Sequence, residues 1–281
     1  MKETLIKAAG SLLRFVNFRL YYRFCSLLVR KLTGERVVSV SNFEIKFETS
    51  DPYWSQLISK HFKYELELEN WLRRECSADD YFVDCGANIG YWSLFVSKVL
   101  NVSNFVAVEP NPRIFQLLIQ NLKLNNLPES AFQGAVGDMS QGNSTTILYL
   151  NVNPGMHVGA SIYQGKTSGV EKFQVPLIEL SDLFEPAIRN NQTILLKLDV
   201  EGAEVSCIKQ IPNSVRSRVR IIYEDHGRDL ECLTTKWLLA TKAYKIYFLR
   251  PLSTLEISSI ETLIDLKKSR SKGYNLVAVP N

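Results

Sequence analysis

Two acidic residues and a glycine-containing turn are the features of this chain best suited to binding a nucleoside-containing cofactor. An apolar run ends at Asp84, and Gly86 and Gly90 follow before a helical pattern begins. A second apolar run, residues 105–108, ends at Glu109. Glycine lets the backbone approach a ligand closely, and a carboxylate at the second strand end can accept hydrogen bonds from both ribose hydroxyls. The pattern therefore predicts a site for a nucleoside.

The acid that precedes the glycines argues against a dinucleotide. The dinucleotide fingerprint is G-x-G-x-x-G directly after a strand. Here Asp84 comes first, and Gly86 and Gly90 stand four positions apart. A carboxylate on this turn would repel a pyrophosphate and would attract a ligand with positive charge. We therefore expect S-adenosylmethionine, which has a sulfonium and an α-amino group and no phosphate. The alternative is a strand-to-helix turn without a ligand.

Three more polar residues stand where other strands are predicted to end. Asp138, Asp199 and His226 each follow or close a run of mainly apolar residues. Ligands of parallel sheets bind at the carboxyl ends of the strands. We therefore expect these residues to lie at the same edge of a sheet as Asp84 and Glu109.

The elements that position these residues alternate between strand and helix. The sequence predicts strands over residues 81–84, 105–109, 131–136, 146–150, 194–199, 219–224, 244–249 and 274–279, and helices over 91–99, 112–125, 203–210, 230–241 and 255–267. Asn111 is a typical N-cap, and Pro112 suits the first position of a helix. Repeated β-α units predict an α/β fold: a mostly parallel twisted sheet with helices on both faces.

The N-terminal part has a different pattern. Residues 37–40 and 43–47 predict two strands joined by a tight turn, and residues 53–76 predict a helix. We expect residues 1–78 to form a helical and β-hairpin cap, and residues 79–281 to form the α/β domain.

The first thirty-two residues predict a basic amphipathic helix. Arg19, Arg23 and Arg30 fall on one arc of a helix at about 100° per residue. No uncharged apolar stretch in this segment is long enough to span a bilayer. The helix could lie on an anionic membrane surface, or it could pack against the main domain.

The composition excludes several classes of function. With 281 residues, 46% hydrophobic and 22% charged, the chain is typical of a globular protein. A net charge of +4 is too small to indicate nucleic-acid binding. The five cysteines are scattered, without the spacing of a zinc site or a disulfide framework. We expect no metal site and a cytoplasmic protein, with membrane association through residues 1–32 as the alternative.

Four segments together resemble the FkbM family of methyltransferases. They are residues 82–91, 108–112, 136–138 and 196–204, in the family's order and spacing. The resemblance implies a class I Rossmann-like methyltransferase fold, S-adenosylmethionine as donor, and methyl transfer, usually to a hydroxyl of a sugar or natural product.

The resemblance also implies roles for the first segment. Asp84, Gly86 and Gly90 should frame the methionine and ribose parts of the donor. Asn88 takes the central glycine position of the wider class I motif, as is usual in this family, and should contact the donor with them.

Two further acids are expected to hold the nucleoside. Glu109 should bind the ribose hydroxyls in a two-point hydrogen bond, which a charged acceptor makes strong. Asp138 should lie beside the adenine amino group. For each, the alternative is a helix N-cap, a common role of acids at strand ends.

Transfer to a hydroxyl needs a general base, because an alcohol is a poor nucleophile until its proton begins to leave. The candidates are Asp199, Glu201 and His226. His226 titrates closest to neutrality, whereas Asp199 has the better position at its strand end. Lys197 and Glu204 could serve instead in structural ion pairs.

The sequence therefore predicts an O-methyltransferase that acts on a glycan, a lipid-linked sugar or a related small molecule. The loop over residues 151–170 and the N-terminal cap are expected to cover the acceptor. One alternative is a non-catalytic membrane-peripheral binding protein that retains the fold. Another is an NAD-dependent oxidoreductase, which the missing fingerprint disfavours. The oligomeric state is open.

Overall fold

The computed structural model describes residues 34–51, 53–58, 63–139, 142–151, 170–227, 229–270 and 272–281. The predicted amphipathic helix, residues 1–32, and most of the loop expected to cover the acceptor lie outside the described residues.

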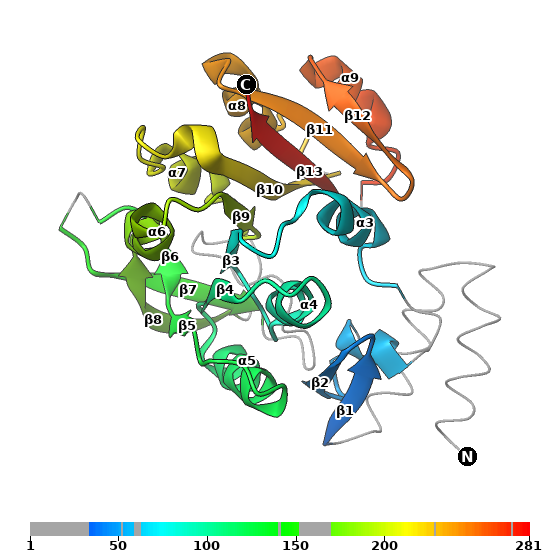
Figure 1. The fold of residues 1–281 in the computed structure, drawn as a ribbon, viewed down its shortest axis with the longest axis vertical. Helices are drawn as coiled ribbons and strands as arrows, with labels where there is room; N and C mark the ends of the chain where they lie inside the picture. The colour runs from blue at the N-terminus through cyan, green and yellow to red at the C-terminus, as the bar shows by residue number, and fades with distance from the viewer. Residues whose placement is uncertain are drawn as a thin grey trace.

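An eight-stranded sheet forms the centre of the molecule (Figure 1). Its strand order is β12-β11-β13-β10-β9-β3-β4-β5. The strands are β3 (Tyr81–Cys85), β4 (Asn104–Glu109), β5 (Ala131–Gln133), β9 (Ile194–Leu198), β10 (Val219–His226), β11 (Tyr244–Arg250), β12 (Ser253–Ile257) and β13 (Gly273–Pro280). From β5 to β10 all neighbours are parallel, and β13 runs antiparallel to β10 and β11 on its two sides. The prediction of a mostly parallel α/β sheet is confirmed.

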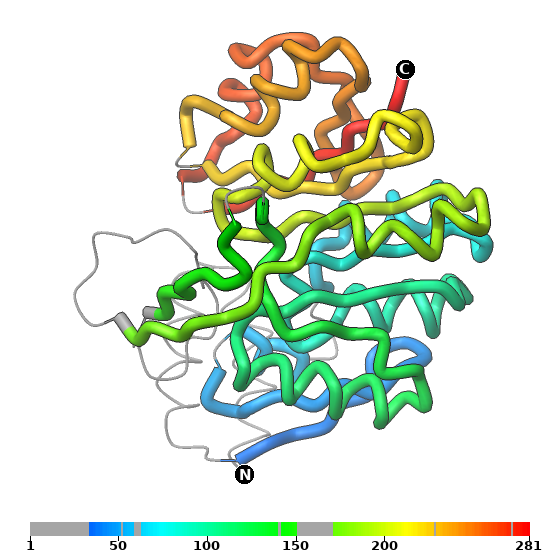
Figure 2. Tube along the Cα trace, turned by 90° about the vertical axis from the view of Figure 1, so that its left-hand side faces the viewer, coloured from blue at the N-terminus to red at the C-terminus, as the bar shows by residue number. Residues whose placement is uncertain are grey.

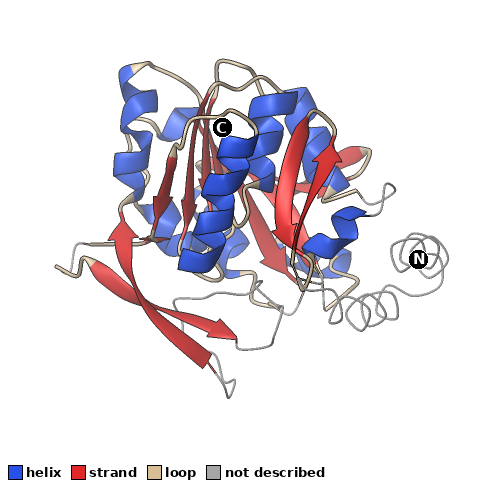
Figure 3. Cartoon of the chain, turned by 90° about the horizontal axis from the view of Figure 1, so that it is seen from below, coloured by secondary structure: helices blue, strands red, loops and turns tan. Residues whose placement is uncertain are grey.

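Helices cover both faces of this sheet (Figure 3). One face packs against α3 (Leu66–Glu75), α4 (Tyr91–Val99) and α5 (Pro112–Leu124). The other packs against α6 (Leu180–Arg189), α7 (Glu204–Lys209), α8 (Leu233–Thr241) and α9 (Ile260–Leu266). Because both faces are covered, the central strands β3 and β9 are buried along their whole length. The N-cap prediction is also confirmed, since Asn111 accepts a hydrogen bond from the backbone of Arg113.

The N-terminal hairpin is joined to α5 by side-chain amides. The hairpin consists of β1 (Glu35–Val40) and β2 (Phe43–Glu48), as predicted. Asn121 accepts from the Lys46 backbone N–H at 2.7 Å and donates to its carbonyl at 2.9 Å. Asn125 makes the same pair of bonds with Glu44. The two asparagines therefore form hydrogen bonds with backbone groups along one edge of β2, as a neighbouring strand would. Figure 2 shows the hairpin beside α5.

The predicted helix over residues 53–76 is wrong as one continuous element. A 3-10 helix η1 (Trp54–Ile58) and helix α3 occupy parts of this range. Glu65, which precedes α3, has a φ of 39°, so the chain enters the helix from a left-handed conformation. The apolar spacing continues through both elements because both pack on the same face of the sheet.

Two other predicted elements divide differently. The strand predicted over residues 131–136 becomes β5 and β6 (Ala135–Val136), which separate at Gly134 and join different sheets. The helix predicted over residues 255–267 begins as β12, which pairs with β11, and becomes helical at α9, where Ser259 is the N-cap. Pairing with a neighbouring strand overrides a local helical pattern in this second case.

A second, three-stranded sheet contains an element that the sequence did not predict. Its order is β6-β8-β7, with β7 (Thr145–Asn151) and β8 (Val170–Ile178) antiparallel. Strand β8 is the element that was not predicted, because the glycine-rich stretch before it is typical of a loop. Helix α6, which follows β8 directly, was not predicted either. Among the described helices, none is long and apolar enough to cross a membrane.

Candidate active site

The glycine turn brings the ends of β3 and β9 into close contact. Gly86 has a φ of +78°, and a Cβ built there would lie 1.9 Å from the Asp199 carbonyl oxygen. Asp199 in turn donates its backbone N–H to Cys85 at 3.0 Å. Gly90, with a φ of +91°, packs against Leu118 as α4 begins. Side chains are excluded at both glycines, so the turn is shaped by packing within the protein as well as by any ligand.

Glu109 holds two segments of the site together. One carboxylate oxygen accepts the Asn88 backbone N–H and the other accepts that of Asn111, both at 2.8 Å. The side chain is buried, and burial raises its pKa to about 7. An ionised carboxylate has about four lone-pair positions. Two therefore remain for the pair of ribose hydroxyls, and the predicted two-point contact is chemically feasible.

Asn88 is held by a tryptophan of the N-terminal cap. Its φ of 53° is left-handed, a conformation that asparagine tolerates better than most residues. Its side-chain oxygen accepts from the indole of Trp54 at 2.9 Å and from the Ile89 backbone at 2.8 Å. The sequence did not identify Trp54 as part of the site, because it is distant in the chain and its spacing matched a core position.

Asp84 lies beneath the edge of the sheet. It is fully buried, and its Oδ2 accepts from the Ser93 hydroxyl at 2.8 Å. Its Oδ1 has no hydrogen-bond partner among the described residues and lies 3.6 Å from the Lys197 ammonium. Burial raises the pKa of Asp84, while Lys197 opposes that shift. A role in framing the donor stays a prediction for this residue.

Lys197 lies between two carboxylates. Its Nζ is 3.6 Å from Asp84 and 3.5 Å from Asp199, and the side chain is buried. Burial alone would lower its pKa, but Asp199 and Asp84 outweigh that effect and raise it. Glu204 accepts the Gly202 backbone N–H instead of pairing with this lysine.

A polar pocket opens beside Lys197 at the carboxyl ends of β9 and β10. Its charged and amide side chains are those of Glu65, Lys197, Asp199, Glu224 and Asn275. Glu224 and Asn275 are directly opposed in the β10–β13 register, so their side chains share a face.

The pocket carboxyls are buried close together. Glu65 accepts the Trp92 indole N–H at 3.0 Å. Burial raises its pKa to about 7, with Asp199 adding to that shift against Lys197. Burial and then Asp199 raise the pKa of Glu224 to about 9. These carboxyls therefore favour a ligand that is cationic or that donates hydrogen bonds.

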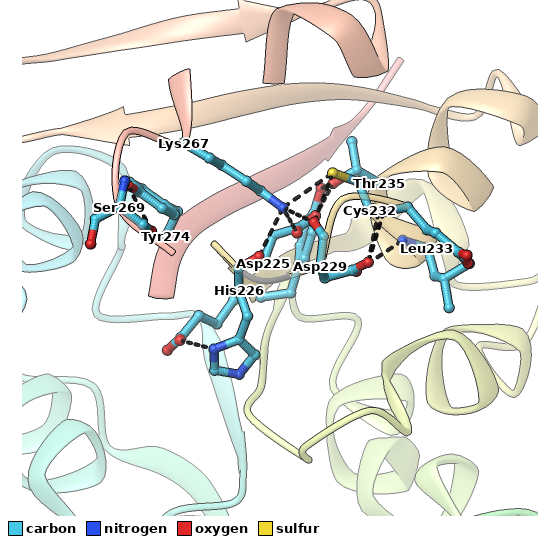
Figure 4. Close-up of polar contacts among 12 residues, drawn as sticks. Asp225, His226, Asp229, Cys232, Leu233, Thr235, Lys267, Ser269 and Tyr274 are labelled. Carbon is cyan, nitrogen blue, oxygen red and sulfur yellow. Dashed lines mark hydrogen bonds and ion pairs between the residues drawn. The ribbon is translucent and has the colours of Figure 1, made fainter. Parts of the chain in front are cut away.

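His226 stands between two glutamates at the end of β10. Figure 4 shows the His226 imidazole; its Nδ1 is 3.2 Å from Glu224, and its Nε2 is 3.8 Å from Glu201. Glu201 has a left-handed φ of 50°, and burial raises its pKa to about 7. The structure therefore brings the predicted base candidates His226 and Glu201 together, with Asp199 on the pocket wall.

Asp138 lies in the segment that contains β5 and β6. It is exposed, and it follows β6 in the segment after β4. The Gly134 backbone N–H donates to the Glu109 carbonyl at 3.2 Å, which places this segment beside Glu109. A contact with adenine stays a prediction.

The sequence missed three residues of the pocket: Glu65, Glu224 and Asn275. Glu224 has a detectable signal, because it lies two positions before His226 on one strand and therefore on the same face. Glu65 and Asn275 enter the pocket through tertiary packing, so no local pattern identifies them. Among the described residues, no group of three or more His, Cys, Asp or Glu is arranged to hold a metal ion.

Comparisons with known proteins identify a methyltransferase family. The family described as the methyltransferase FkbM domain matches residues 84–240, more than half of the chain. Methyltransferase sdnD of Sordaria araneosa is 26% identical over 201 residues, covering 57% of this chain and 78% of the relative. The hexuronic acid methyltransferase AglP of Haloferax volcanii is 24% identical over 220 residues, covering 75% and 84%.

A solved structure of methyltransferase FkbM from Methylobacillus flagellatus superposes with a TM-score of 0.45 at 13% identity. The alignment covers 92% of this chain and 57% of that protein. The fold has the strand order of a class I Rossmann-like methyltransferase, and the match over residues 84–240 includes Glu109, Lys197 and His226. On this ground the chain belongs to the FkbM methyltransferase family.

Proposed function

We propose that the protein is an S-adenosylmethionine-dependent O-methyltransferase that acts on a hydroxyl of a glycan, a lipid-linked sugar or a related small molecule. One observation carries the proposal: Glu109 and the glycine turn lie at the same edge of the sheet as the polar pocket. This arrangement supports a nucleoside site next to an acceptor site. Membership of a methyltransferase family supports this assignment.

The residues present fit a cationic donor that carries no phosphate. The turn is flanked by Asp84, Glu109 and Asp199, and the buried cation among them, Lys197, is already paired. Glu109 would hold the ribose, with Gly86 and Gly90 allowing close approach to the backbone. S-adenosylmethionine supplies an electrophilic methyl group on a positively charged sulfur. The buried Oδ1 of Asp84 faces the Lys197 ammonium at 3.6 Å and accepts no hydrogen bond among the described residues.

The proton of the acceptor hydroxyl would pass to His226. A neutral imidazole accepts a proton at Nδ1 or Nε2, and the carboxyl oxygens of Glu224 and Glu201 on its two sides would accept hydrogen bonds from the resulting imidazolium. Asp199 is the second candidate, but its carboxylate is already engaged by Lys197 at 3.5 Å. Burial of the reactants in the pocket would hold them in alignment, which is a large part of the rate gain in bimolecular transfer.

The charge of the pocket favours an acceptor without a carboxylate. Of the described residues that line it, three are carboxyls and one is a lysine. An acidic sugar would find the one lysine of this lining already paired with Asp84 and Asp199, whereas a neutral polyol would exchange hydrogen bonds with the carboxyls. A relative named as a hexuronic acid methyltransferase supports a sugar acceptor. The charge of this pocket favours neutral sugars over acidic ones.

The test is a transfer assay with isotope-labelled S-adenosylmethionine against cell-extract glycan, lipid-linked and small-molecule fractions, each separated into neutral and acidic pools. We expect label in a neutral pool. His226→Gln should reduce transfer by about 10²-fold or more, while Asp199→Asn should reduce it less, and the exposed control Glu129→Gln should have no effect. Absence of label from every fraction would contradict the proposal. An equal loss of transfer in His226→Gln and Asp199→Asn would contradict the assignment of His226 as the main base.

A further inference from the structure

The buried ammonium group of Lys267 is the centre of a polar cluster behind the active site (Figure 4). It forms an ion pair with Asp225, and it donates to the carbonyl oxygens of His226 at 3.0 Å and Asp229 at 2.8 Å. The Cys232 sulfur lies 3.1 Å away. Lysine is rarely so buried unless its charge is compensated, and here it contacts two backbone carbonyls of a single loop.

The cluster lies on the opposite side of β10 from the pocket. Successive side chains of a strand alternate between faces. Glu224 and His226 therefore point to the pocket side, whereas Asp225 points back toward α8 and α9. The second oxygen of Asp225 accepts from Thr235 at 2.9 Å, so both oxygens of this carboxylate are used. Figure 4 shows Lys267 and the His226 imidazole on opposite sides of the strand.

Further contacts hold the loop from His226 to Leu233, since Asp229 also donates its backbone N–H to the His226 carbonyl at 3.0 Å. The Asp229 carboxylate accepts the backbone N–H groups of Glu231 and Cys232, at 2.9 and 3.0 Å, just before α8 begins. Gly227 donates to the Lys272 carbonyl at 2.9 Å, and a Cβ on Gly227 would lie 1.9 Å from the Ser269 carbonyl oxygen. The C-terminal segment that carries Lys267 thus packs directly on the loop that begins at His226.

The same segment also limits the position of Glu224. A Cβ at Gly273 would lie 1.4 Å from the Glu224 carboxylate, so this carboxylate packs directly against the Gly273 backbone. The segment that fixes both members of the Glu224–His226 pair lies beyond residue 240, where the family match ends.

We propose that Lys267 is a positioning residue of the active site: by binding the His226 and Asp229 carbonyls from behind, it fixes the imidazole against Glu224. Only one part of this proposal rests on the proposed function, namely that the orientation of the imidazole serves proton transfer. The link between Lys267 and the imidazole itself is a structural claim, so it can be measured without any acceptor.

The test variant must not leave a charge buried alone. Lys267→Met would leave Asp225 as an unpaired buried carboxylate, which is strongly destabilising. The double variant Asp225→Asn/Lys267→Met removes both charges and also removes the donor to the two loop carbonyls. Leu263→Ala is the matched control, because it opens a cavity at a fully buried position one turn earlier on α9 without touching the loop.

The first measurement is NMR of protein labelled at the histidine ring carbon Cε1. The chain has three histidines, so His226→Gln assigns the resonance. We expect the His226 resonance of Asp225→Asn/Lys267→Met to move toward that of free histidine, and that of Leu263→Ala to stay in place. An unchanged resonance in the double variant, or an equal change in both variants, would overturn the proposal.

The second measurement is a kinetic cycle with labelled S-adenosylmethionine and the extract fraction that accepts label. We expect Asp225→Asn/Lys267→Met to lower kcat about 10- to 100-fold with little change in the donor KM, and to have no further effect in a His226→Gln background. An equal loss in both backgrounds would show a merely structural role. Full activity of His226→Gln alone would refute the base assignment of the proposed function, while the NMR result would still decide the link from Lys267 to the imidazole.

Discussion

Glu109 combines a structural and a predicted ligand-binding role in one side chain. Its two oxygens hold the glycine turn and the start of α5 at the same time. A substitution of Glu109 would therefore change the shape of the site as well as its chemistry. Donor affinity and the folded state of the variant must be measured together. The same is true of Asn88, whose side chain joins the turn to Trp54.

Gly86 provides a test of the packing of the turn at the scale of one residue. Gly86→Ala should unfold more easily than the wild type, because φ is positive and the new Cβ would meet the Asp199 carbonyl. Gly142→Ala is the matched control, with a φ of +79° and nothing within 4 Å of its Cβ. The control should lose about 1–2 kcal/mol of stability from the backbone conformation alone. Gly86→Ala should lose about 1–3 kcal/mol more from overpacking.

Urea denaturation of the two variants measures this difference. Equal free energies of unfolding for Gly86→Ala and Gly142→Ala would show that the close approach of β3 and β9 does not depend on a glycine at position 86.

Residues at strand ends were predictable from the sequence, and residues that approach from other elements were not. Asp84, Glu109 and Asp199 follow apolar runs, so the order of elements alone placed them at one edge of the sheet. Glu65 and Trp54 reach the site from the N-terminal cap, through contacts that only the folded chain creates. The burial of Asp84 could not be predicted either, because it depends on Lys197 from a strand more than a hundred residues later.

At the scale of elements, α5 connects the hairpin to the glycine turn. Asn121 is fully buried and bonds both backbone groups of Lys46, and it also donates to the Ile89 carbonyl at 2.8 Å. One side chain therefore joins β2, α5 and the turn that begins α4.

Asn121→Ala should cost about 3 kcal/mol, because three buried backbone groups lose their partner. Gln120→Ala on the same helix is the control: Gln120 contacts the Lys46 ammonium at an exposed position, and its loss should cost less than about 0.5 kcal/mol. Hydrogen exchange of the Lys46 amide should accelerate in the first variant and stay unchanged in the second. Unaltered exchange in Asn121→Ala would contradict the proposed role of this amide.

Long periodic elements were predicted correctly, whereas elements defined by a partner were not. Helix α4 has its predicted bounds, 91–99, because its apolar face alone specifies it. Strand β12 has no such local signal, since four of its five residues are exposed and it forms by pairing with β11. The same explanation applies to β5 and β6, whose separation is decided by which neighbour each one pairs with.

At the scale of the whole molecule, the active site should make the unliganded protein less stable as pH rises. Burial raises the pKa of Glu65, Glu109 and Glu201 from 4.5 to about 7, and that of Glu224 to about 9. Between these values the folded state binds more protons than the unfolded state, so the free energy of unfolding falls with rising pH.

The melting temperature should therefore be lower at pH 8 than at pH 6. Glu224→Gln should flatten the decline, most of all between pH 7 and pH 9, because it removes the group that titrates highest. Melting curves in buffers of equal ionic strength measure both effects. A melting temperature that is constant or rises over this range would contradict the account of buried, proton-retaining carboxyls.

The central claim is that the edge of the sheet at Glu109 binds a nucleoside donor without phosphate. Titration calorimetry with S-adenosylhomocysteine tests it most directly, with NAD as the comparison ligand and Glu109→Gln as the variant. We expect the wild type to bind S-adenosylhomocysteine and not NAD, and Glu109→Gln to lose at least about tenfold in affinity while remaining folded by circular dichroism. Binding of NAD in preference to S-adenosylhomocysteine, or an unchanged affinity in Glu109→Gln, would contradict it.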